Sequence, residues 1–514
     1  MRHDFVVTAA STRIGAPTTD DPVVHRLSRL IGGPFGRHVR SRPWSWWTPL
    51  RVMLVLTALT SLLGFAQKAS CATHPWSNDY QYTRVCYTDV FVLYTAEGLS
   101  GDQDKGTQVG VPYRDHPVEY PAVIGGLMWV GAEAAHLIHP DDPHVVNGTL
   151  IDDRPHTFFD VSVLMLAIGA LVMTWSVAAV AGRRRVWDAA MVAVAPIIVF
   201  DGFINWDFAA VALTCLGLWA WSRQRHLWAG AFLGLGVATK LYPILVLLAL
   251  GLLCLRTAQI REWVKSVAAA VAAFVIAYLP FLLVSYGKTF PFPDATCAQS
   301  RPLSPLLFFW KFSQIRGADW GSSWLAARQL SGSSLDNPSC GQSPSLLNLG
   351  VALATVFVVA AVALLAVSSR RRPRVAQIAF LLVAGFVLVN KVDSPQYCLW
   401  LLPLAVLALP RWGPILVWQA TEVVLTIANF YVLANQDKPT TGLPMWPYLT
   451  AMFLRDAVLL WVMGLVVRDV LRPMHDVVRR DGTDDPAGGI LDGALDRWDP
   501  DRIEAAMPLP ASVG

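Results

Sequence analysis

A few acidic, basic and aromatic residues lie in the polar links between apolar runs of the sequence. Asp89 lies in the stretch 87–94, where apolar residues recur at helical spacing. This spacing predicts a short amphipathic helix that carries Tyr94 and starts at Thr88 or Asp89. At this place the carboxylate of Asp89 can cap the helix and complement its dipole. A carboxylate at a surface can also take a proton from a hydroxyl, so Asp89 is a candidate general base.

Lysine provides the opposite charge. Lys240 lies at the centre of the apolar stretch 227–255, where an ammonium is costly unless it faces water, a counter-ion or an anionic ligand. Tyr242 and Pro243 follow it, and the proline predicts a break between two short helices. Phosphate binding and a lysine that snorkels to the membrane interface both account for this position.

Three other polar links carry candidates for contacts with a substrate. They hold Glu119 with Tyr120, Asp207 beside Asn205, and a tight turn with Lys391, Asp393, Gln396 and Tyr397. Each link also has a simple structural explanation, because interfacial aromatic residues, helix-initiating prolines and Asp-Ser-Pro turns are common at helix ends. Glu422 lies inside an apolar run and predicts an intramembrane polar contact.

The elements that position these residues must lie in a membrane. Of 514 residues, 54% are hydrophobic and 15% are charged, and the mean hydropathy is +0.44, so the chain has too much apolar surface for a soluble core. The net charge of +4 does not indicate nucleic-acid binding, because the basic residues cluster at the ends of apolar runs. A nucleic acid is therefore not expected as a partner.

Apolar runs of roughly 17 to 25 residues predict an all-α, polytopic transmembrane bundle of about 12 spans. If the arginine clusters mark the cytoplasmic side, both termini lie inside and residues 227–255 form two helices that meet near Lys240. The run 122–138 does not fit this parity and predicts an interfacial or re-entrant helix, unless the run 159–181 has other bounds. The remaining expected spans are 49–66, 188–204, 206–222, 264–286, 346–368, 375–391, 397–410, 413–434 and 446–467.

The chain then divides into three parts. Residues 1–48 form a basic cytoplasmic segment, and residues 49–472 form the membrane domain with outer loops at 67–158 and 287–345. Residues 473–514 form a cytoplasmic tail, whose charged, Gly-rich and Pro-rich composition predicts disorder.

In this topology every candidate residue except Glu422 falls on the outer side. A carboxylate, one or two lysines and several aromatic residues match what a reaction on a lipid-phosphate substrate needs, namely a base, an anion clamp and sugar-stacking surfaces. The outer loops also hold four cysteines. Pairing within each loop, Cys71 with Cys86 and Cys297 with Cys340, stays open because it requires an oxidising outside.

The order of these features resembles glycosyltransferase family 87, whose members are polyprenyl-phosphate-sugar-dependent enzymes with a GT-C fold. The resemblance covers roughly residues 50–435 and is carried by short motifs: Asp89 with Tyr94, Tyr120 with Pro121, Lys240 to Pro243, and Ser394 to Tyr397 with Trp400. Where a second proline is usual after Pro121, this sequence has Ala122. In such enzymes the aspartate of the first outer loop is taken as the catalytic base.

The resemblance implies a single inverting displacement at the extracytoplasmic face of the plasma membrane. Asp89 would take the proton of an acceptor hydroxyl, and polyprenyl phosphate would leave with its charge held by Lys240 and Lys391. For the transferred sugar, mannose is the first choice and arabinofuranose the second. The acceptor would be a cell-envelope glycan or glycolipid. No cofactor is expected, and no metal, because the sequence has no His or Cys cluster of ligand spacing.

Two other classes of protein remain open. A transporter or lipid-linked-sugar flippase would also have many spans, but it would be expected to place ionisable residues near the bilayer midplane and to contain paired broken helices. A non-catalytic partner of envelope-building enzymes would share the same composition.

Overall fold

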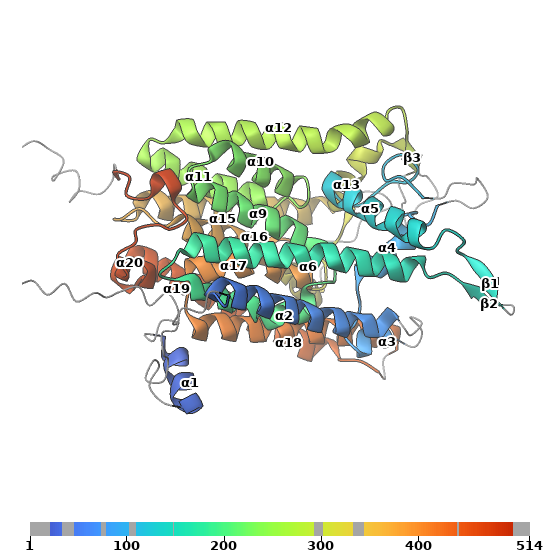
Figure 1. Ribbon diagram of the computed structural model, residues 1–514, viewed down its shortest axis with the longest axis horizontal. Coiled ribbons are helices and arrows are strands. Elements are labelled where there is room, and N and C mark those ends of the chain that lie inside the picture. Colours follow the sequence, from blue (N-terminus) through green and yellow to red (C-terminus); the bar gives the residue numbers. More distant parts are fainter. Residues whose placement is uncertain are drawn as a thin grey trace, which may run out of the picture.

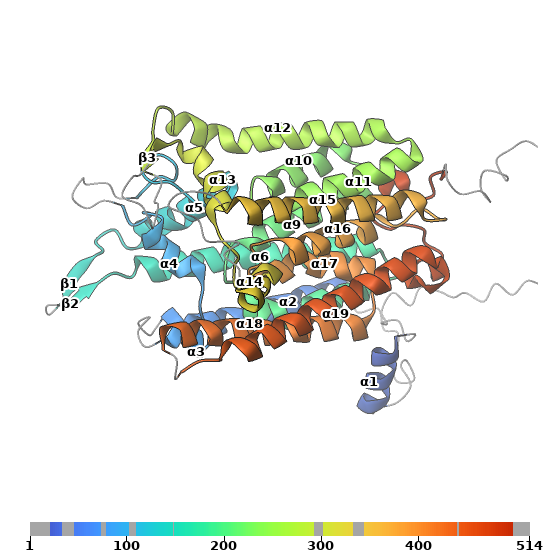
Figure 2. The same ribbon diagram turned by 180° about the vertical axis from the view of Figure 1, so that it is seen from behind.

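The computed structural model describes residues 21–32, 46–72, 79–101, 109–146, 149–291, 302–332, 344–438 and 441–496. Within these ranges the protein is a bundle of helices whose long axes run roughly side by side (Figures 1 and 2). The predicted all-α class is confirmed, since β-structure in the described ranges is limited to two small hairpins and one isolated bridge between Pro112 and His116. The hairpins are β1 (His144–Val146) with β2 (Thr149–Ile151) and β3 (Phe290–Pro291) with β4 (Pro302–Leu303).

Six helices of the described chain are long and apolar enough to cross a membrane. They are α2 (Pro49–Ala72), α6 (Arg154–Ala181), α12 (Ile260–Val284), α15 (Ser345–Ser368), α18 (Trp412–Asp437) and α19 (Met445–Leu471). Shorter apolar helices complete the bundle: α5 (Ala122–Ile138), α9 (Asp207–Ser222), α10 (His226–Val237), α11 (Pro243–Thr257), α16 (Val375–Val389) and α17 (Cys398–Ala408). The protein is therefore a polytopic membrane protein, as its composition predicts.

The predicted break at Lys240 is confirmed. The apolar stretch 227–255 forms α10 and α11, and Pro243 is the first residue of α11, where its missing N–H leaves no bond unmade. Gly230 and Gly234 let α10 lie directly on α12, because a Cβ at either glycine would come within 2.1 Å of a carbonyl oxygen of α12. This close packing places the turn that carries Lys240.

The predicted span 188–204 needs correction, whereas the run 122–138 forms a helix with the predicted bounds. The run 188–204 is not one span but three short pieces, η2 (Val186–Ala189), α7 (Ala190–Ala193) and α8 (Pro196–Asp201), because Pro196 interrupts the helix. The run 122–138, whose place was unsettled, is the continuous 17-residue helix α5, and α6 begins at Arg154, five residues before the predicted span.

The predicted disorder of the C-terminal tail is wrong for residues 473–496. This segment forms η4 (Pro473–His475), α20 (Val477–Arg480) and η5 (Gly489–Leu491) against one end of the bundle. Three buried ion pairs hold it there: Arg374 with Asp476 at 2.7 Å, Arg372 with Asp485 at 3.1 Å and Arg256 with Asp496 at 2.7 Å. The arginines lie far away in the sequence, in α11 and in the link between α15 and α16, so composition within the tail does not reveal its partners.

The outer loops are partly described. Cys71 and Cys86 form a disulfide that joins the end of α2 to the segment before α4 (Asp89–Ala96). Cys297 and Cys340 lie outside the described residues. Figure 1 shows α4, α5, α13 (Pro305–Ile315) and the β1–β2 hairpin at one end of the bundle, and α20 at the other.

Candidate active site

A cavity of about 460 Å³ lies at the end of the bundle that carries α4 and α13. Segments from distant parts of the sequence line it: the start of α4, the link before α5, the link before α9, the α10–α11 turn, the end of α13 and the α16–α17 turn. Its charged and amide side chains are Asp89, Glu119, Asn205, Lys240, Arg316, Asp319, Asp393, Gln396 and Asn429. The structure thus brings most of the sequence-predicted residues together.

Asp89 is held in place through the backbone around it. Thr88, and not Asp89, caps α4, because its hydroxyl oxygen accepts a hydrogen bond from the N–H of Val90. The Thr88 hydroxyl also donates to the carbonyl of Phe203 at 2.7 Å, and the N–H of Asp89 donates to the carbonyl of Ile204 at 2.8 Å. Of the two residues that could start the helix, Thr88 is therefore the cap, while Asp89 lies in the first turn of α4 and its carboxylate lines the cavity.

The Asp89 carboxylate accepts one hydrogen bond on each oxygen. The Tyr87 hydroxyl donates to Oδ1 at 2.8 Å, and Nδ2 of Asn205 donates to Oδ2 at 2.8 Å. Burial raises the pKa of Asp89 above the ordinary aspartate value, while the hydrogen bonds from Asn205 and Tyr87 and the charge of Lys240 act against this rise. The two hydrogen bonds orient the carboxylate. Its raised pKa makes it a stronger base, as a proton acceptor requires.

Asn205 connects the acidic and the basic side of the cavity. Its Nδ2 also donates to the hydroxyl of Tyr120 at 2.8 Å, and its Oδ1 accepts from Nζ of Lys240 at 3.3 Å and from the N–H of Trp206 at 2.7 Å. With both ends of the amide engaged, its orientation is determined. The sequence interpretation placed Asn205 in a polar turn but gave it no role.

Lys240 is balanced by a buried carboxylate. Its Nζ lies 3.6 Å from Oδ2 of Asp207, whose side chain is fully buried and whose Oδ1 accepts from Nε1 of Trp400 at 2.7 Å. The ammonium also lies 5.0 Å from the ring centroid of Tyr120, within the range of a cation–π interaction. Asp207 therefore stands behind Lys240 as its counter-ion and does not line the cavity.

Arg316 is a cation of this cavity that the sequence interpretation missed. It follows α13 directly, its side chain is 39% exposed, and its guanidinium lies 3.1 Å from Asp319. The nearby Glu119 has a pKa that burial raises and that the Arg316 charge lowers. The available signal was an arginine just after an apolar run in an outer loop, which by itself is common.

Lys391 does not line the cavity. Its ammonium donates to the backbone carbonyls of Gln314 at 3.2 Å and Arg316 at 2.6 Å, and to Oδ1 of Asn348 at 2.6 Å. The Lys391 carbonyl in turn accepts from the N–H of Asp319 at 2.8 Å. The predicted anion clamp at Lys391 is thus better described as a support for the loop that carries Arg316.

The other predicted residues divide between the cavity wall and the core. Gln396 and Tyr397 line the wall, as does Asp393, which pairs with the buried Arg455 of α19. Tyr397 stacks on Trp400 with ring centroids 3.8 Å apart, and Tyr242 also stacks on Trp400, with centroids 4.6 Å apart. Tyr242 and the buried Tyr94, which packs on Phe158 at 5.2 Å, do not reach the cavity.

Glu422 makes the intramembrane polar contact that its sequence position predicts. Its Oε1 accepts from Nε1 of Trp418 at 2.7 Å and lies 3.9 Å from Arg455. Among the described residues one group has ligand atoms close enough for a metal ion, namely His139, Asp142 and Asp153 within 4.8 Å of one another. It lies beside the β1–β2 hairpin and outside the cavity.

With this geometry established, the chain can be compared with known proteins. Residues 156–390 match the model of glycosyltransferase family 87, which confirms the resemblance seen in the sequence motifs. The matched range contains Asn205, Lys240 and Arg316, whereas Asp89, Glu119 and Tyr120 precede it. No curated protein matches the chain. The match and the helical bundle together indicate a membrane glycosyltransferase.

Proposed function

We propose that this protein transfers a sugar from a polyprenyl-phosphate donor to a hydroxyl of an extracytoplasmic cell-envelope glycan or glycolipid, with inversion at the anomeric carbon. The observation that carries the proposal is the pair of groups on either side of Asn205. Asp89, a carboxylate with a raised pKa, accepts from Nδ2, and Lys240, a cation, donates to Oδ1. One cavity thus presents a base and an anion-binding group to a substrate.

The reaction proceeds as a single displacement. The acceptor oxygen attacks the anomeric carbon and forms the new glycosidic bond while its proton passes to the Asp89 carboxylate. The bond between the anomeric carbon and the phosphate oxygen breaks, and its electron pair leaves with polyprenyl phosphate. Lys240 and Arg316 stabilise the negative charge that develops on this leaving group. Arg316 takes the part that the sequence interpretation assigned to Lys391.

The remaining polar side chains of the wall suit the sugar. Glu119, Asp393 and Gln396 offer oxygen and nitrogen atoms for sugar hydroxyls, and the ring of Tyr397 offers a stacking surface. No cofactor enters the proposal, because a phosphate is already a competent leaving group and arginine and lysine supply its counter-charge.

The arrangement of the arginines supports the proposed side of the membrane. Clusters such as 183–185 and 370–372 lie at the end of the bundle opposite the cavity, together with Arg411 and Arg468. The positive-inside rule makes that end cytoplasmic. We therefore place the active site at the extracytoplasmic face of the plasma membrane, where the acceptor would be an envelope component.

A transfer assay tests the proposal directly. Purified protein in lipid is incubated with a radiolabelled β-linked polyprenyl-phosphate sugar and an envelope glycan fraction, and label in the glycan is counted. We expect α-linked transfer from the mannose donor, with the arabinofuranose donor as the second choice. Transfer from neither donor, with the protein folded, would contradict the proposed donor class.

The transporter alternative makes a different prediction in the same vesicles. A flippase would move the labelled lipid between leaflets without forming a glycosidic bond, so label would stay in the lipid fraction. The family match favours the glycosyltransferase, because it names an enzyme class.

The pH dependence of the reaction is expected to report on Asp89. The base must be ionised, and its raised pKa means that the rate falls at a higher pH than an ordinary aspartate would give. Tyr87→Phe removes a hydrogen bond that stabilises the ionised form. We expect the acidic limb of kcat/KM against pH to move up by about one pH unit.

Tyr82→Phe is the control for this profile. Tyr82 also lines the cavity, and its ring stacks on that of Tyr87 with centroids 5.9 Å apart. The substitution leaves both hydrogen bonds to Asp89 in place, so its profile should match the wild type. An acidic limb unmoved in Tyr87→Phe would show that a group other than Asp89 titrates.

A further inference from the structure

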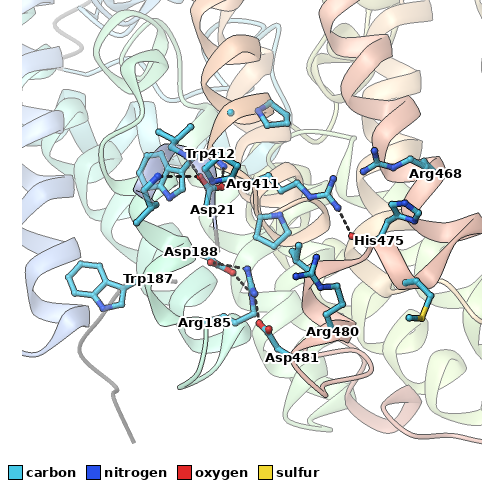
Figure 3. Close-up of a pocket in the computed structure, with 18 residues that line it drawn as sticks. Asp21, Arg185, Trp187, Asp188, Arg411, Trp412, Arg468, His475, Arg480 and Asp481 are labelled. Carbon is cyan, nitrogen blue, oxygen red and sulfur yellow. Dashed lines mark hydrogen bonds and ion pairs between the residues drawn. The ribbon is translucent and has the colours of Figure 1, made fainter. Parts of the chain in front are cut away.

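A second cavity, of about 480 Å³, is shown in Figure 3. It lies at the end of the bundle that carries α1 (Pro22–Gly32) and α20, opposite the candidate active site (Figure 1). The start of α1, the α6–η2 link, the α17–α18 turn and the segment from the end of α19 to α20 line it. This is the end where the arginine clusters lie, so the positive-inside rule places it at the cytoplasmic surface of the membrane. The proposed reaction uses none of its residues.

One half of this cavity has more cations than carboxylates. Arg411 and Arg468 share Asp469, at 2.8 Å and 2.9 Å, and Arg411 also donates to the carbonyl of His475. Arg480 is exposed, and within the described ranges its guanidinium makes no hydrogen bond or ion pair. Figure 3 shows it between Arg411 and Arg185. This half of the cavity thus has three guanidinium groups, those of Arg411, Arg468 and Arg480, and one carboxylate, that of Asp469.

The other half has more carboxylates than cations. Arg185 is the shared partner of Asp188, at 2.7 Å, and of Asp481, whose side chain is 38% exposed. The carboxylate of Asp21 accepts from the N–H groups of Val23 at 2.8 Å and Trp412 at 3.0 Å. A purely anionic ligand would therefore meet repulsion on this side, whereas a ligand with a second, cationic group would not.

The rim has the composition of a membrane interface. Trp187, Trp412 and Val23 line the cavity, Met474 at its edge is 83% exposed, and Leu27 on α1 is 51% exposed. Aromatic and apolar residues of this kind are enriched at headgroup depth, and a helix such as α1 can lie in the interface. A lipid headgroup can reach the cavity from this depth.

We propose that this cavity binds the zwitterionic headgroup of an aminophospholipid, with the phosphate beside Arg480 and the ammonium beside Asp481. Arginine suits the phosphate because its planar donors match phosphate oxygens. The exposed carboxylate of Asp481 supplies the partner that the ammonium needs. The bound headgroup joins α1, α18 and α20, so it stabilises the packing of the C-terminal segment on the bundle.

The test measures thermal unfolding of the full chain in detergent, with added dioleoyl phosphatidylethanolamine, dioleoyl phosphatidylglycerol or inorganic phosphate. A ligand that binds the folded state raises the midpoint in a concentration-dependent way. We expect phosphatidylethanolamine to give the largest rise at equal concentration. Arg480→Ala should weaken its apparent affinity by about tenfold or more, and Asp481→Asn should abolish its advantage over phosphatidylglycerol.

Arg472→Ala is the matched control, because Arg472 is an exposed arginine at the same end that does not line the cavity. It should respond to each lipid as the wild type does. An unchanged response in Arg480→Ala would overturn the proposal. So would a rise from phosphatidylglycerol equal to that from phosphatidylethanolamine in the wild type, or a rise from inorganic phosphate alone. The measurement does not depend on glycosyl transfer, so it stands apart from the proposed function.

Discussion

Asp89→Asn is expected to lower kcat for sugar transfer by about 10³-fold, because removal of a general base typically costs 10²-fold to 10⁴-fold. Asparagine has nearly the same shape and can still accept the hydrogen bond from Tyr87. It cannot take the acceptor proton as the new glycosidic bond forms. Donor binding, measured as retention of labelled polyprenyl-phosphate sugar without acceptor, should remain within a few-fold of the wild type.

Asp141→Asn is the control for this variant. Asp141 is an exposed carboxylate near the β1–β2 hairpin, outside the cavity. The substitution removes the same charge from the same end of the bundle and should leave transfer unchanged. Equal transfer by Asp89→Asn and wild type, with both folded, would remove Asp89 from the mechanism and with it the main support for the proposed function.

Arg316→Gln has the second largest expected effect, a fall in kcat/KM of about 10²-fold to 10³-fold. Its guanidinium is proposed to stabilise the charge that develops on the departing phosphate, and loss of one such donor typically has a cost of this size. Arg316→Lys keeps the charge but loses the planar pair of donors, so it should fall between wild type and Arg316→Gln. Initial rates at several donor concentrations measure all three proteins.

Arg316 is a better test of the clamp than Lys240. Removal of Lys240 would leave Asp207, a fully buried carboxylate, without its counter-ion, and loss of one partner of a buried pair commonly costs about 3–5 kcal/mol of stability. The ion pair between Arg316 and Asp319 is partly exposed and contributes little to stability. A loss of activity in Arg316→Gln therefore does not follow from unfolding.

Lys311→Gln completes the experiment. Lys311 is an exposed cation of α13, the same helix that Arg316 follows, and it does not line the cavity. Its replacement should leave kcat/KM within about twofold of the wild type, as surface substitutions usually have small effects. An equal fall in both variants would indicate a general effect of charge near the membrane and would exclude a specific clamp at Arg316.

The α10–α11 turn shows what local sequence can reveal. The stretch 227–255 is too long for one helix between two basic ends, and Pro243 supplies a break, so the position of Lys240 at a turn follows from length and a single proline. The same reasoning predicted most of the helices. It failed at 188–204, where hydropathy is continuous but Pro196 interrupts the hydrogen bonding.

Arg316 shows where such reasoning stops. It lies in the outer loop 287–345, and its position depends on Lys391, which is 75 residues away and donates to its carbonyl oxygen. The C-terminal segment is a second example, because Asp476 pairs with Arg374, which lies 102 residues away in the sequence. A solvated charge and a buried, paired charge look alike in the sequence, because their difference lies in the partner.

The sequence by itself determined that this is a polytopic helical membrane protein with a break at Lys240, because apolar length, proline and arginine positions act locally. It also contained the short motifs of a glycosyltransferase family. Only the tertiary structure decided that Thr88 caps α4 while Asp89 faces a cavity, and that Asn205 joins Asp89 to Lys240. The physical reason is that hydrogen bonds between side chains act over about 3 Å, whatever the distance along the chain.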